Sequence, residues 1–574
     1  MSQQIFIGPY VHSISKDKIE YVPFSIISVV KGKIEWIEKC HPSQLKEVGE
    51  RYGILKYLNI PTHTKKDYEI LEQDELDVDH RRQLWHESQA QDGLEEDEDG
   101  TLHVSTSTKR SINEEKDDDD DVLSQSGKQE EHIGLERVEV EVIRLDDDEF
   151  LCPGLIDTHT HAPQFPNNGL GGSLQLLEWL EKLTFPEEKK YEDLDYAKRV
   201  YERVVERTLR SGTTTSCYYA TIHVESSVLL ARICERRGQR AFIGKCNMDR
   251  NSPPTYIEPS TSSSLQSTHE FISHFPSPSS PTSLVRPILT PRFAISCTSA
   301  LLHGLSSISN SYSPPLPIQT HLSENPSEVE LAKKLYNSST YTEIYHSHGL
   351  LRKGTILAHC VHLEPSERNL IAECGAGVSH CPTSNINLLS GSCRVVELLD
   401  QGIPVGLGTD CSGGYSIGVL NTLRDASTVS RCLAFGEKGR RWLSVEELFA
   451  MATLGGAEVC GLQDRIGNFQ VGKEFDALRI CPTSPGMWVG EEDKLDWSDV
   501  GKGFNEQSHA QSFHFSKSEN GAMGVSGIHG DAKGWMKEWE EKEKEKLKKR
   551  FETWLWTGDD RDLAGVWVRG RKVV

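Results

Sequence analysis

The sequence contains no apolar run approaching the roughly 20 residues that a helix needs to cross a bilayer, and its mean hydropathy is −0.48. No basic segment precedes an apolar one at the beginning of the chain, so we expect no signal peptide. Basic side chains are also scarce, since 63 Lys and Arg stand against 86 Asp and Glu, a formal net charge of −23. Such a surface repels phosphates and anionic lipids, so we expect neither nucleic acid nor membrane partners.

The 14 cysteines form no Cys-x-x-Cys pair, and no Pro-Cys dipeptide occurs. The first absence excludes a thiolate zinc knuckle. The second excludes the cytidine-type zinc deaminases, whose signature joins His-x-Glu to a later Pro-Cys-x-x-Cys. His362-Leu363-Glu364 matches only the first half of that signature, and we interpret the match as chance. Scattered cysteines without an export signal predict reduced thiols and a cytoplasmic location.

Length and local composition divide the chain into several predicted parts. A chain of 574 residues fits one large domain plus an accessory domain. Residues 71–135 carry too little apolar surface to offset the entropy of ordering, so they predict a disordered acidic insertion. The Ser-, Thr- and Pro-rich residues 252–283 predict a surface loop, and the Gly-, Ser- and His-rich residues 501–534 predict a polar insertion.

Eight short apolar runs, most of them followed by helical patterns, lie between these segments. Buried parallel strands have this composition, and strands that alternate with helices favour a parallel sheet closed into a barrel. We therefore predict an α/β fold, a TIM-like (β/α)8 barrel, over residues 153–464. The predicted strands are 154–157, 213–219, 240–248, 285–293, 316–322, 355–360, 377–381 and 404–410. The predicted helices include 196–209, 224–236 and 326–336.

The two ends of the chain have a different pattern. Residues 138–143 alternate Val and Glu as a half-exposed strand does, and residues 566–574 have the pattern of a final hairpin. Residues 535–556 predict a highly charged helix with Glu and Lys at helical spacing. We therefore predict that the chain ends form a small β-sandwich domain beside the barrel. The segments assigned to this domain are 1–70, 136–152 and 465–574.

A His-x-His pair, His159 and His161, follows the first predicted strand. Residues i and i+2 of an extended chain point to the same side, so both imidazoles can reach one ion. The pair alone is a weak signal, because two neighbouring histidines are equally compatible with an ordinary surface or core position.

Three further candidates, His321, His359 and Asp410, end predicted strands five, six and eight. Barrel enzymes place catalytic groups at these carboxyl ends, because the strands converge there on one pocket. Three imidazoles with a carboxylate suit zinc, with one position left open for water, and zinc lowers the pKa of that water to about 7. Strand four ends without a lysine that could bridge two metals, so we predict a single ion. His380, at strand seven, we interpret as pocket wall rather than ligand.

Long segments of the chain resemble the amidohydrolase superfamily and, within it, the guanine deaminase family. The resemblance covers residues 150–480 well and the two ends weakly, and the predicted insertions exceed what this family normally carries. The His-x-His pair and the Asp410 segment mark the superfamily, whereas Gln164, Arg292 and Phe293 point to guanine. The matching segments are Pro153–Gln164, Leu176–Leu180, Ser211–His223, Thr290–Phe293, His321–Glu324, His380–Asn385, Gly406–Tyr415 and Ile466–Ala477.

The resemblance implies how the metal site is built. His159, His161, His321 and Asp410 would bind one zinc ion, although the sequence does not separate zinc from iron. His359 would hydrogen-bond the metal-bound water and would also lie against the substrate.

The resemblance also implies how protons move and how the substrate binds. Glu324 would carry a proton to the purine ring and later to the leaving ammonia, and Asp410 would accept the proton of the attacking water. Gln164 would hydrogen-bond the base, and Arg292 its carbonyl oxygen. Phe293 would stack on the ring. The alternative for Arg292 is a residue that only forms a surface salt bridge.

Taken together, these features predict hydrolytic deamination of guanine to xanthine and ammonia by a zinc-bound hydroxide, and the resemblance implies a homodimer. One alternative is another amidohydrolase that acts on a different purine, a pyrimidine or a triazine. A second alternative is a non-catalytic scaffold, which is disfavoured because every expected ligand and the proton shuttle are present.

Overall fold

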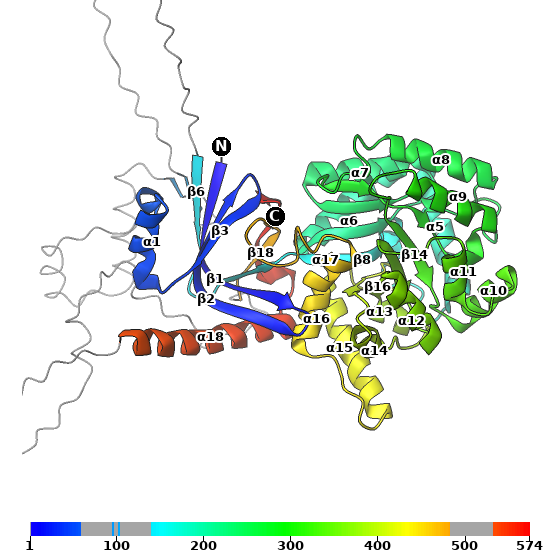
Figure 1. Ribbon diagram of the computed structural model, residues 1–574. Helices are drawn as coiled ribbons and strands as arrows, with labels where there is room; N and C mark the ends of the chain where they lie inside the picture. The colour runs from blue at the N-terminus through cyan, green and yellow to red at the C-terminus, as the bar shows by residue number, and fades with distance from the viewer. Residues whose placement is uncertain (1, 59–94, 97–100, 104–138, 483–531) are drawn as a thin grey trace, which may run out of the picture.

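The computed structural model describes residues 2–58, 95–96, 101–103, 139–482 and 532–574. Its elements form two lobes, a mainly β lobe that contains both chain ends and a larger lobe in which helices cover a sheet (Figure 1). The predicted disordered segment at 71–135 lies outside the described residues, apart from two short strands. The predicted insertion at 501–534 lies outside them up to residue 531, and its last three residues begin a helix.

The larger lobe is built on an eight-stranded parallel sheet with the order β12-β10-β9-β8-β17-β16-β15-β14. An isolated parallel bridge between Leu289 and Ile318 joins the chain just after β12 to the start of β14. The prediction of alternating strands and helices around a parallel sheet is confirmed. The strands are β8 (Leu155–His161), β9 (Thr213–Tyr219), β10 (Arg240–Gly244), β12 (Val285–Pro287), β14 (Ile318–Leu322), β15 (Thr355–His359), β16 (Gly377–His380) and β17 (Val405–Leu407).

The first strand of this sheet is longer than predicted. The prediction ended it at Asp157 and placed the two histidines beyond it, whereas β8 continues to His161. Every residue of β8 is buried, and after an irregularity its pairing with β9 continues to the His161–Tyr219 position. The histidines are therefore held by a hydrogen-bonded strand and not by a loop.

Two of the predicted strands each divide in two. The run at 240–248 forms β10 and β11 (Cys246–Asn247), and the run at 285–293 forms β12 and β13 (Thr290–Pro291). β11 and β13 pair with each other as a separate two-stranded sheet.

Helices cover the outside of the parallel sheet (Figure 1), and the three helices predicted at 196–209, 224–236 and 326–336 are confirmed. The helices between β8 and β14 are α4 (Leu176–Trp179), α5 (Phe185–Lys189), α6 (Leu194–Arg210), α7 (Val224–Arg237), α8 (Thr261–Ser273) and α9 (Ser299–Asn310). Those after β14 are α10 (Pro326–Tyr336), α11 (Tyr341–Ser347), α12 (Pro365–Cys374), α13 (Pro382–Asn387), α14 (Val395–Asp400), α15 (Val419–Gly436), α16 (Val445–Ala452) and α17 (Leu454–Val459).

The start of α10 shows how local sequence signals fix the chain next to the predicted site. Asn325 caps the helix by accepting a hydrogen bond from the Ser327 N–H, and Glu328 accepts one from the Asn325 N–H. Pro326 occupies the first helical position, where no N–H is needed. Glu328 also accepts the N–H of Glu324, so the capping box holds the backbone of the predicted proton shuttle.

The prediction of a loop over 252–283 is wrong, because α8 lies within that segment. The Ser260 side chain caps the helix by accepting a backbone N–H. Phe271 and Ile272 bury its apolar side. Ser and Thr are weak helix formers, and here packing outweighs their propensity.

The smaller lobe is a mixed sheet that branches at its first strand. β1 pairs with β2 in the antiparallel sense and with β6 and β7 in the parallel sense, and β18 and β19 continue the sheet beyond β7. Both ends of the chain therefore share one hydrogen-bonded network. Its strands are β1 (Ser2–Ser15), β2 (Lys18–Val30), β3 (Lys33–Lys39), β4 (Glu95–Glu96), β5 (Thr101–His103), β6 (Glu139–Arg144), β7 (Phe150–Pro153), β18 (Ala477–Ile480), β19 (Leu563–Val568) and β20 (Arg571–Lys572).

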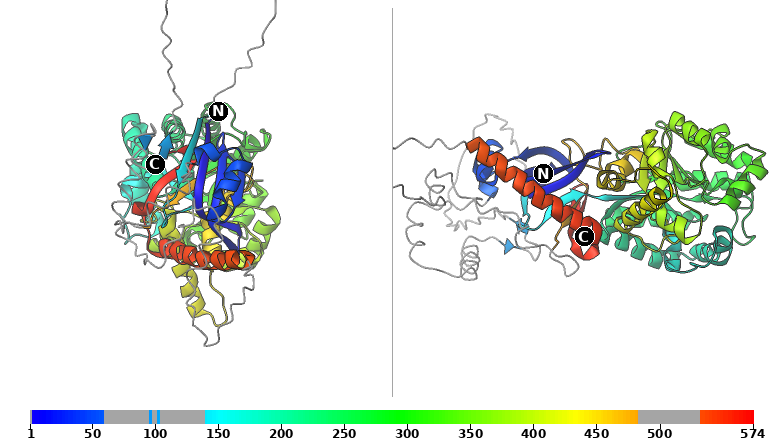
Figure 2. Two further views of the ribbon diagram at one scale, coloured as in Figure 1. Left: turned by 90° about the vertical axis from the view of Figure 1, so that its left-hand side faces the viewer. Right: turned by 90° about the horizontal axis from the view of Figure 1, so that it is seen from below.

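Two helices accompany this sheet, α1 (Leu45–Arg51) and the long, charged α18 (Ala532–Thr557). Seen from below, α18 lies along the smaller lobe (Figure 2), and it buries Phe551 and Trp554 against Phe150 of β7. The predictions of a charged helix here and of a final hairpin, β19 with β20, are confirmed. In the part of the chain that the structure describes, every helix is too short or too polar to span a bilayer.

Candidate active site

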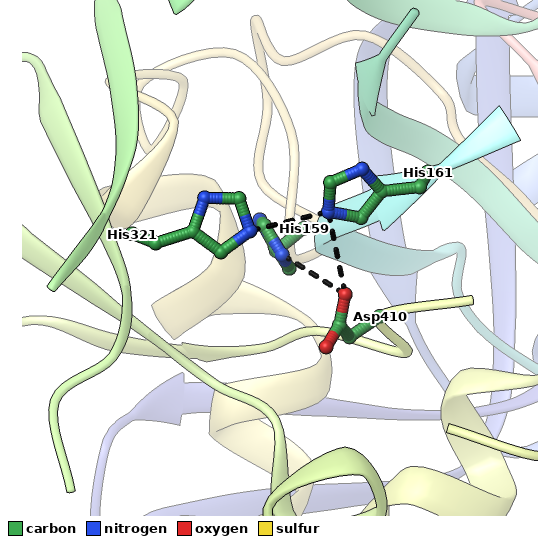
Figure 3. Close-up of side chains that lie close together, drawn as sticks. All are labelled: His159, His161, His321 and Asp410. Atoms are coloured by element: carbon green, nitrogen blue, oxygen red, sulfur yellow. Dashed lines mark hydrogen bonds and ion pairs between the residues drawn. The ribbon is translucent and has the colours of Figure 1, made fainter. Parts of the chain in front are cut away.

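The four predicted metal ligands converge at the carboxyl ends of the parallel strands (Figure 3). One ligand atom of each lies within 4.8 Å of the others, and all four side chains are buried. Asp410 Oδ1 is 3.2 Å from His159 Nε2 and 3.4 Å from His161 Nε2. His161 Nε2 is 3.2 Å from His321 Nε2. The side chains come from β8, β14 and the turn after β17, so segments far apart in the sequence form one group.

The imidazoles of this group are in the form that a metal binds. Burial lowers the pKa of His159, and it lowers the pKa of His161 and His321 further, so the rings are neutral near pH 7. His321 Nδ1 donates to the backbone carbonyl oxygen of Arg292 at 2.5 Å, which leaves the lone pair on Nε2 facing the group. A neutral ring whose other nitrogen is fixed by a carbonyl is the usual form of a metal-binding histidine.

Two carboxyl groups flank His359 beside this group. His359 Nε2 lies 3.4 Å from Glu324 Oε2 and 3.8 Å from Asp410 Oδ2. Burial and the Asp410 charge raise the pKa of Glu324 well above its ordinary value. Burial acts in the same direction on Asp410, but the bond to His159 and the nearby imidazoles lower the pKa of Asp410 well below its ordinary value. The two carboxyl groups that face this imidazole thus have pKa values shifted in opposite directions.

Backbone strain is concentrated at the strand ends that present these side chains. The angle φ is 50° at Ser323, 71° at His359, 52° at Cys360 and 45° at Asp410. This left-handed conformation costs a residue other than glycine about 1–3 kcal/mol, and it persists only where neighbouring contacts hold it. The Asp410 N–H donates to the His159 carbonyl oxygen at 2.9 Å. This backbone hydrogen bond ties the turn that carries Asp410 to the strand that carries His159.

Asn385 fixes the orientation of His359. The Asn385 Oδ1 atom lies 2.9 Å from His359 Nδ1 and accepts its N–H. The Nε2 atom of His359 is left to face Glu324 and Asp410, and among the described residues it forms no hydrogen bond.

A small cavity lies beside the metal-ligand group. Its lining combines ionisable and polar side chains with apolar ones. The polar lining residues are His161, Gln164, Arg292, His321, Glu324, Glu328 and Asp410. The apolar lining residues are Leu176, Trp179, Leu180, Phe293 and Leu388.

The predicted substrate contacts Gln164 and Arg292 are both tied to Glu188 of α5. Arg292 Nη1 and Nη2 donate to Glu188 Oε2 and Oε1 at 2.5 and 3.0 Å, and Gln164 Nε2 donates to Glu188 Oε1 at 2.9 Å. Arg292 is buried, which rules out the alternative of a surface salt-bridge residue. Phe293, on the same cavity wall, has its ring centre 5.9 Å from that of His321.

Two residues of this arrangement were missed by the sequence analysis, Glu188 and Asn385. Glu187 and Glu188 stand at a helix start and are followed by Lys189 and Lys190, a pattern typical of an exposed first turn. Nothing local indicates that Glu188 is buried. Asn385 lies in a segment that resembles the amidohydrolases, but its contact with His359 depends on the packing of β15 against the chain after β16.

His380, interpreted as pocket wall, is buried on β16, and burial lowers its pKa to about 3. Within the described residues it belongs to neither of the two groups of closely placed metal-binding atoms. The second of these groups joins His359 and Cys381 to His159, so it overlaps the first.

Comparison with known proteins places this geometry in a family. Residues 150–504 match the amidohydrolase family. A probable guanine deaminase of Schizosaccharomyces pombe is 43% identical over 428 residues, which cover 74% of this chain and 71% of that protein. A guanine deaminase of Dictyostelium discoideum is 43% identical over 425 residues, 74% of this chain and 82% of that protein.

The fold agrees with solved structures. The crystal structure of a guanine deaminase from C. acetobutylicum, with guanine bound in its active site, superposes with a TM-score of 0.68. The two sequences are 27% identical, and the match covers 100% of each chain. Both the sequence match and the arrangement of histidines and aspartate at the strand ends lead to the same assignment: this chain belongs to the amidohydrolase family.

Proposed function

We propose that this chain deaminates guanine hydrolytically, giving xanthine and ammonia, with one zinc ion held by His159, His161, His321 and Asp410. The observation that carries the proposal is the group of four ligand atoms within 4.8 Å of one another, at the edge of a cavity that also presents Arg292. The relatives named guanine deaminases cover the greater part of the chain and support guanine as the substrate.

The four side chains fit zinc by the chemistry of their donor atoms. Zinc prefers imidazole nitrogen and carboxylate oxygen in a site that leaves one position open for catalysis, and the group offers three neutral imidazoles and one ionised carboxylate. When bound there, zinc supplies a Lewis acid that lowers the pKa of a water molecule to about 7.

The chain's own acid and base then handle the protons. Asp410 Oδ2 is placed to accept a proton from the attacking water, because the carboxyl group is ionised and reaches the metal-ligand group through Oδ1. Glu324 Oε2 is placed to donate a proton to the ring, because burial and the Asp410 charge raise its pKa and so favour the protonated form. His359 Nε2 lies 3.4 Å from Glu324 Oε2 and 3.8 Å from Asp410 Oδ2, where it would orient the attacking water.

The cavity wall binds and orients the base. Arg292 and Gln164 present hydrogen-bonding groups to its polar edge, and Phe293 offers an apolar ring face. The apolar side chains Trp179 and Leu388 also line the cavity and would exclude water from it. Excluding water strengthens the electrostatic contacts of the reacting groups.

We also propose the finer architecture expected from the sequence. The Leu289–Ile318 bridge supports closure of the eight-stranded sheet into a barrel over residues 153–464. The branch of the smaller sheet at β1 supports a β-sandwich built from both ends of the chain. A homodimer in the cytoplasm remains a prediction of the family resemblance, and sedimentation of the purified chain would measure its oligomeric state.

The proposed function is tested by offering the purified chain guanine, adenine, cytosine and an amino-triazine. We expect ammonia and xanthine from guanine, with the other substrates turned over far more slowly. Turnover of adenine or cytosine without turnover of guanine would overturn the proposed substrate and favour another amidohydrolase reaction.

Arg292→Lys should raise the KM for guanine about 10- to 100-fold, the loss expected when one charge-assisted hydrogen bond is removed. The ammonium of lysine keeps the charge but cannot pair with Glu188 through two parallel bonds and still face the base. The kcat value should change less, because the metal-ligand group is untouched. Steady-state kinetics checks both constants, with Arg286→Lys on β12 as the matched control, since Arg286 contacts Phe242 and not the cavity. An unchanged KM would remove Arg292 from the substrate site.

Asn385→Ala should lower kcat about 10- to 100-fold, the range seen when an outer partner of a metal-site group is removed. The loss follows because the His359 ring would no longer have a fixed orientation. Asn385→Asp keeps an oxygen acceptor for Nδ1 and should retain more activity than the alanine variant. Kinetics and metal analysis of both variants are the measurements, and equal activity in the alanine variant and the unchanged protein would contradict this role.

A further inference from the structure

We propose that Glu188 is a positioning residue that makes the base-binding wall select a neutral oxopurine over an anionic one, which favours guanine over its product xanthine. The inference rests on the proposed deamination of guanine. Glu188 belongs to α5, and among the described residues it does not line the cavity, so it acts through the side chains in front of it.

Four hydrogen bonds converge on the Glu188 carboxylate. Oε1 accepts from Gln164 Nε2 at 2.9 Å and from Arg292 Nη2 at 3.0 Å. Oε2 accepts from the Tyr256 hydroxyl at 2.8 Å and from Arg292 Nη1 at 2.5 Å. Every residue in this network is at most 1% exposed. A buried carboxylate with all of its acceptor sites filled is held in one orientation, and it holds its partners in turn.

This network decides which groups the wall presents to a ligand. An arginine has five N–H donors, and Glu188 accepts two of those of Arg292. Only the remaining three can be offered to a ligand. The Gln164 amide is fixed at both ends, because Nε2 donates to Glu188 and Oε1 accepts the Ser412 N–H at 3.2 Å. The wall therefore keeps one assignment of donors and acceptors.

The network also sets the charge behind the wall. The Glu188 carboxylate neutralises the Arg292 guanidinium, and the two remain a buried ion pair, with the pKa of Arg292 raised against the effect of burial by the Glu188 charge. Without Glu188, the positive charge of Arg292 would be uncompensated in a medium of low dielectric constant. The other ionisable side chains around the pair and the cavity are Cys246, Tyr256, His161, His321, Glu324, Glu328 and Asp410.

Substrate and product differ in charge more than in shape. Deamination replaces the amino group of guanine by a second carbonyl, which leaves an imide N–H between two carbonyl groups. The ring nitrogen N3, which carries no proton in guanine, gains an N–H at the same time. That added N–H is more acidic than any in guanine, so xanthine becomes anionic in mildly alkaline solution while guanine stays neutral. An uncompensated guanidinium would attract the anion and slow its release, whereas the neutral Glu188–Arg292 pair does not.

The test compares two ligands that cannot be deaminated, xanthine and hypoxanthine, by calorimetry on the zinc-loaded full chain in mildly alkaline buffer. Hypoxanthine shares the oxopurine ring but remains largely neutral there. Glu188→Gln should strengthen xanthine binding relative to hypoxanthine binding about tenfold or more, the size expected for one uncompensated charge near the ligand. An unchanged ratio of the two dissociation constants would overturn the proposal.

The neighbouring Glu187→Gln is the matched control. Glu187 is also buried on α5, but it pairs with Lys190 at 2.6 Å and not with Arg292. The control should leave the xanthine to hypoxanthine ratio unchanged, and an equal shift in both variants would show a structural effect of losing a carboxylate from this helix, against the proposal. A double variant, Glu188→Gln with Arg292→Gln, removes both charges and should return the ratio to within about threefold of the unchanged protein.

The unchanged protein provides a second measurement in case the Glu188 variants do not fold. Its xanthine affinity should weaken relative to hypoxanthine when the buffer changes from mildly acidic to mildly alkaline, since xanthine ionises in that interval. A ratio that stays constant would overturn the proposal. Neither ligand needs turnover, so a failure of guanine deamination would be seen separately, as the absence of ammonia release from guanine.

Discussion

Replacing Glu324 with glutamine should lower kcat for guanine roughly 100- to 10,000-fold, the contribution of a positioned acid–base group. Glutamine keeps the size of the side chain and its contact with Ser390, but it has no acidic proton to donate. The raised pKa of Glu324 adds a pH dependence with a definite sign. Because the proposed role requires the protonated form, kcat in the unchanged protein should fall as the pH rises through that pKa.

The decisive comparison for this variant is between turnover and metal content. Glu324 is not one of the four ligands, so Glu324→Gln should hold as much zinc as the unchanged protein. Glu330→Gln is the control, because Glu330 is an exposed glutamate on the adjacent helix α10. Full activity in Glu324→Gln would refute the proton-shuttle role, and loss of zinc from it would show that the side chain belongs to the metal site instead.

Replacing Asp410 with asparagine should reduce activity further, roughly 10,000-fold, because one change removes both a proposed metal ligand and the proposed base. Asparagine has nearly the same shape, so the fold and the turn after β17 should persist. Burial lowers the pKa of His159 and His161, and the Asp410 carboxylate partly opposes that effect. The asparagine variant loses this opposing interaction. Metal analysis of the purified variant should show less than one zinc per chain.

Asp400→Asn serves as the control for this change. Asp400 is an exposed residue at the end of α14 that pairs with Arg441. It does not belong to the metal-ligand group. It should keep both zinc and activity. If Asp410→Asn retained a full zinc complement and normal kcat, neither of its two proposed roles would stand.

The sequence predicted the parts of the site that depend on strand periodicity and strand ends. His159 and His161 were placed together because alternate residues of an extended chain share a side. His321 and Asp410 were placed with them because parallel strands present their carboxyl ends at one edge. The structure brings all four side chains into one group, even though β8 is longer than predicted.

The sequence could not predict the side chains that support this group from behind. Glu188 lies in a short helix after a π-helical turn at Leu180–Thr184, and it is buried against Gln164, Tyr256 and Arg292, which come from other segments of the chain. Its partner Arg292 is 104 residues away in the chain. The same holds for Asn385 and His359, since a hydrogen bond between side chains on separate segments leaves no local pattern.

The most direct test of the account is a titration of metal-free protein with zinc, following ammonia release from guanine. We expect metal-free protein to be inactive and activity to rise linearly until one zinc is bound per chain, with no further gain beyond it. Full activity without bound metal would contradict the account, and so would a requirement for two ions per chain.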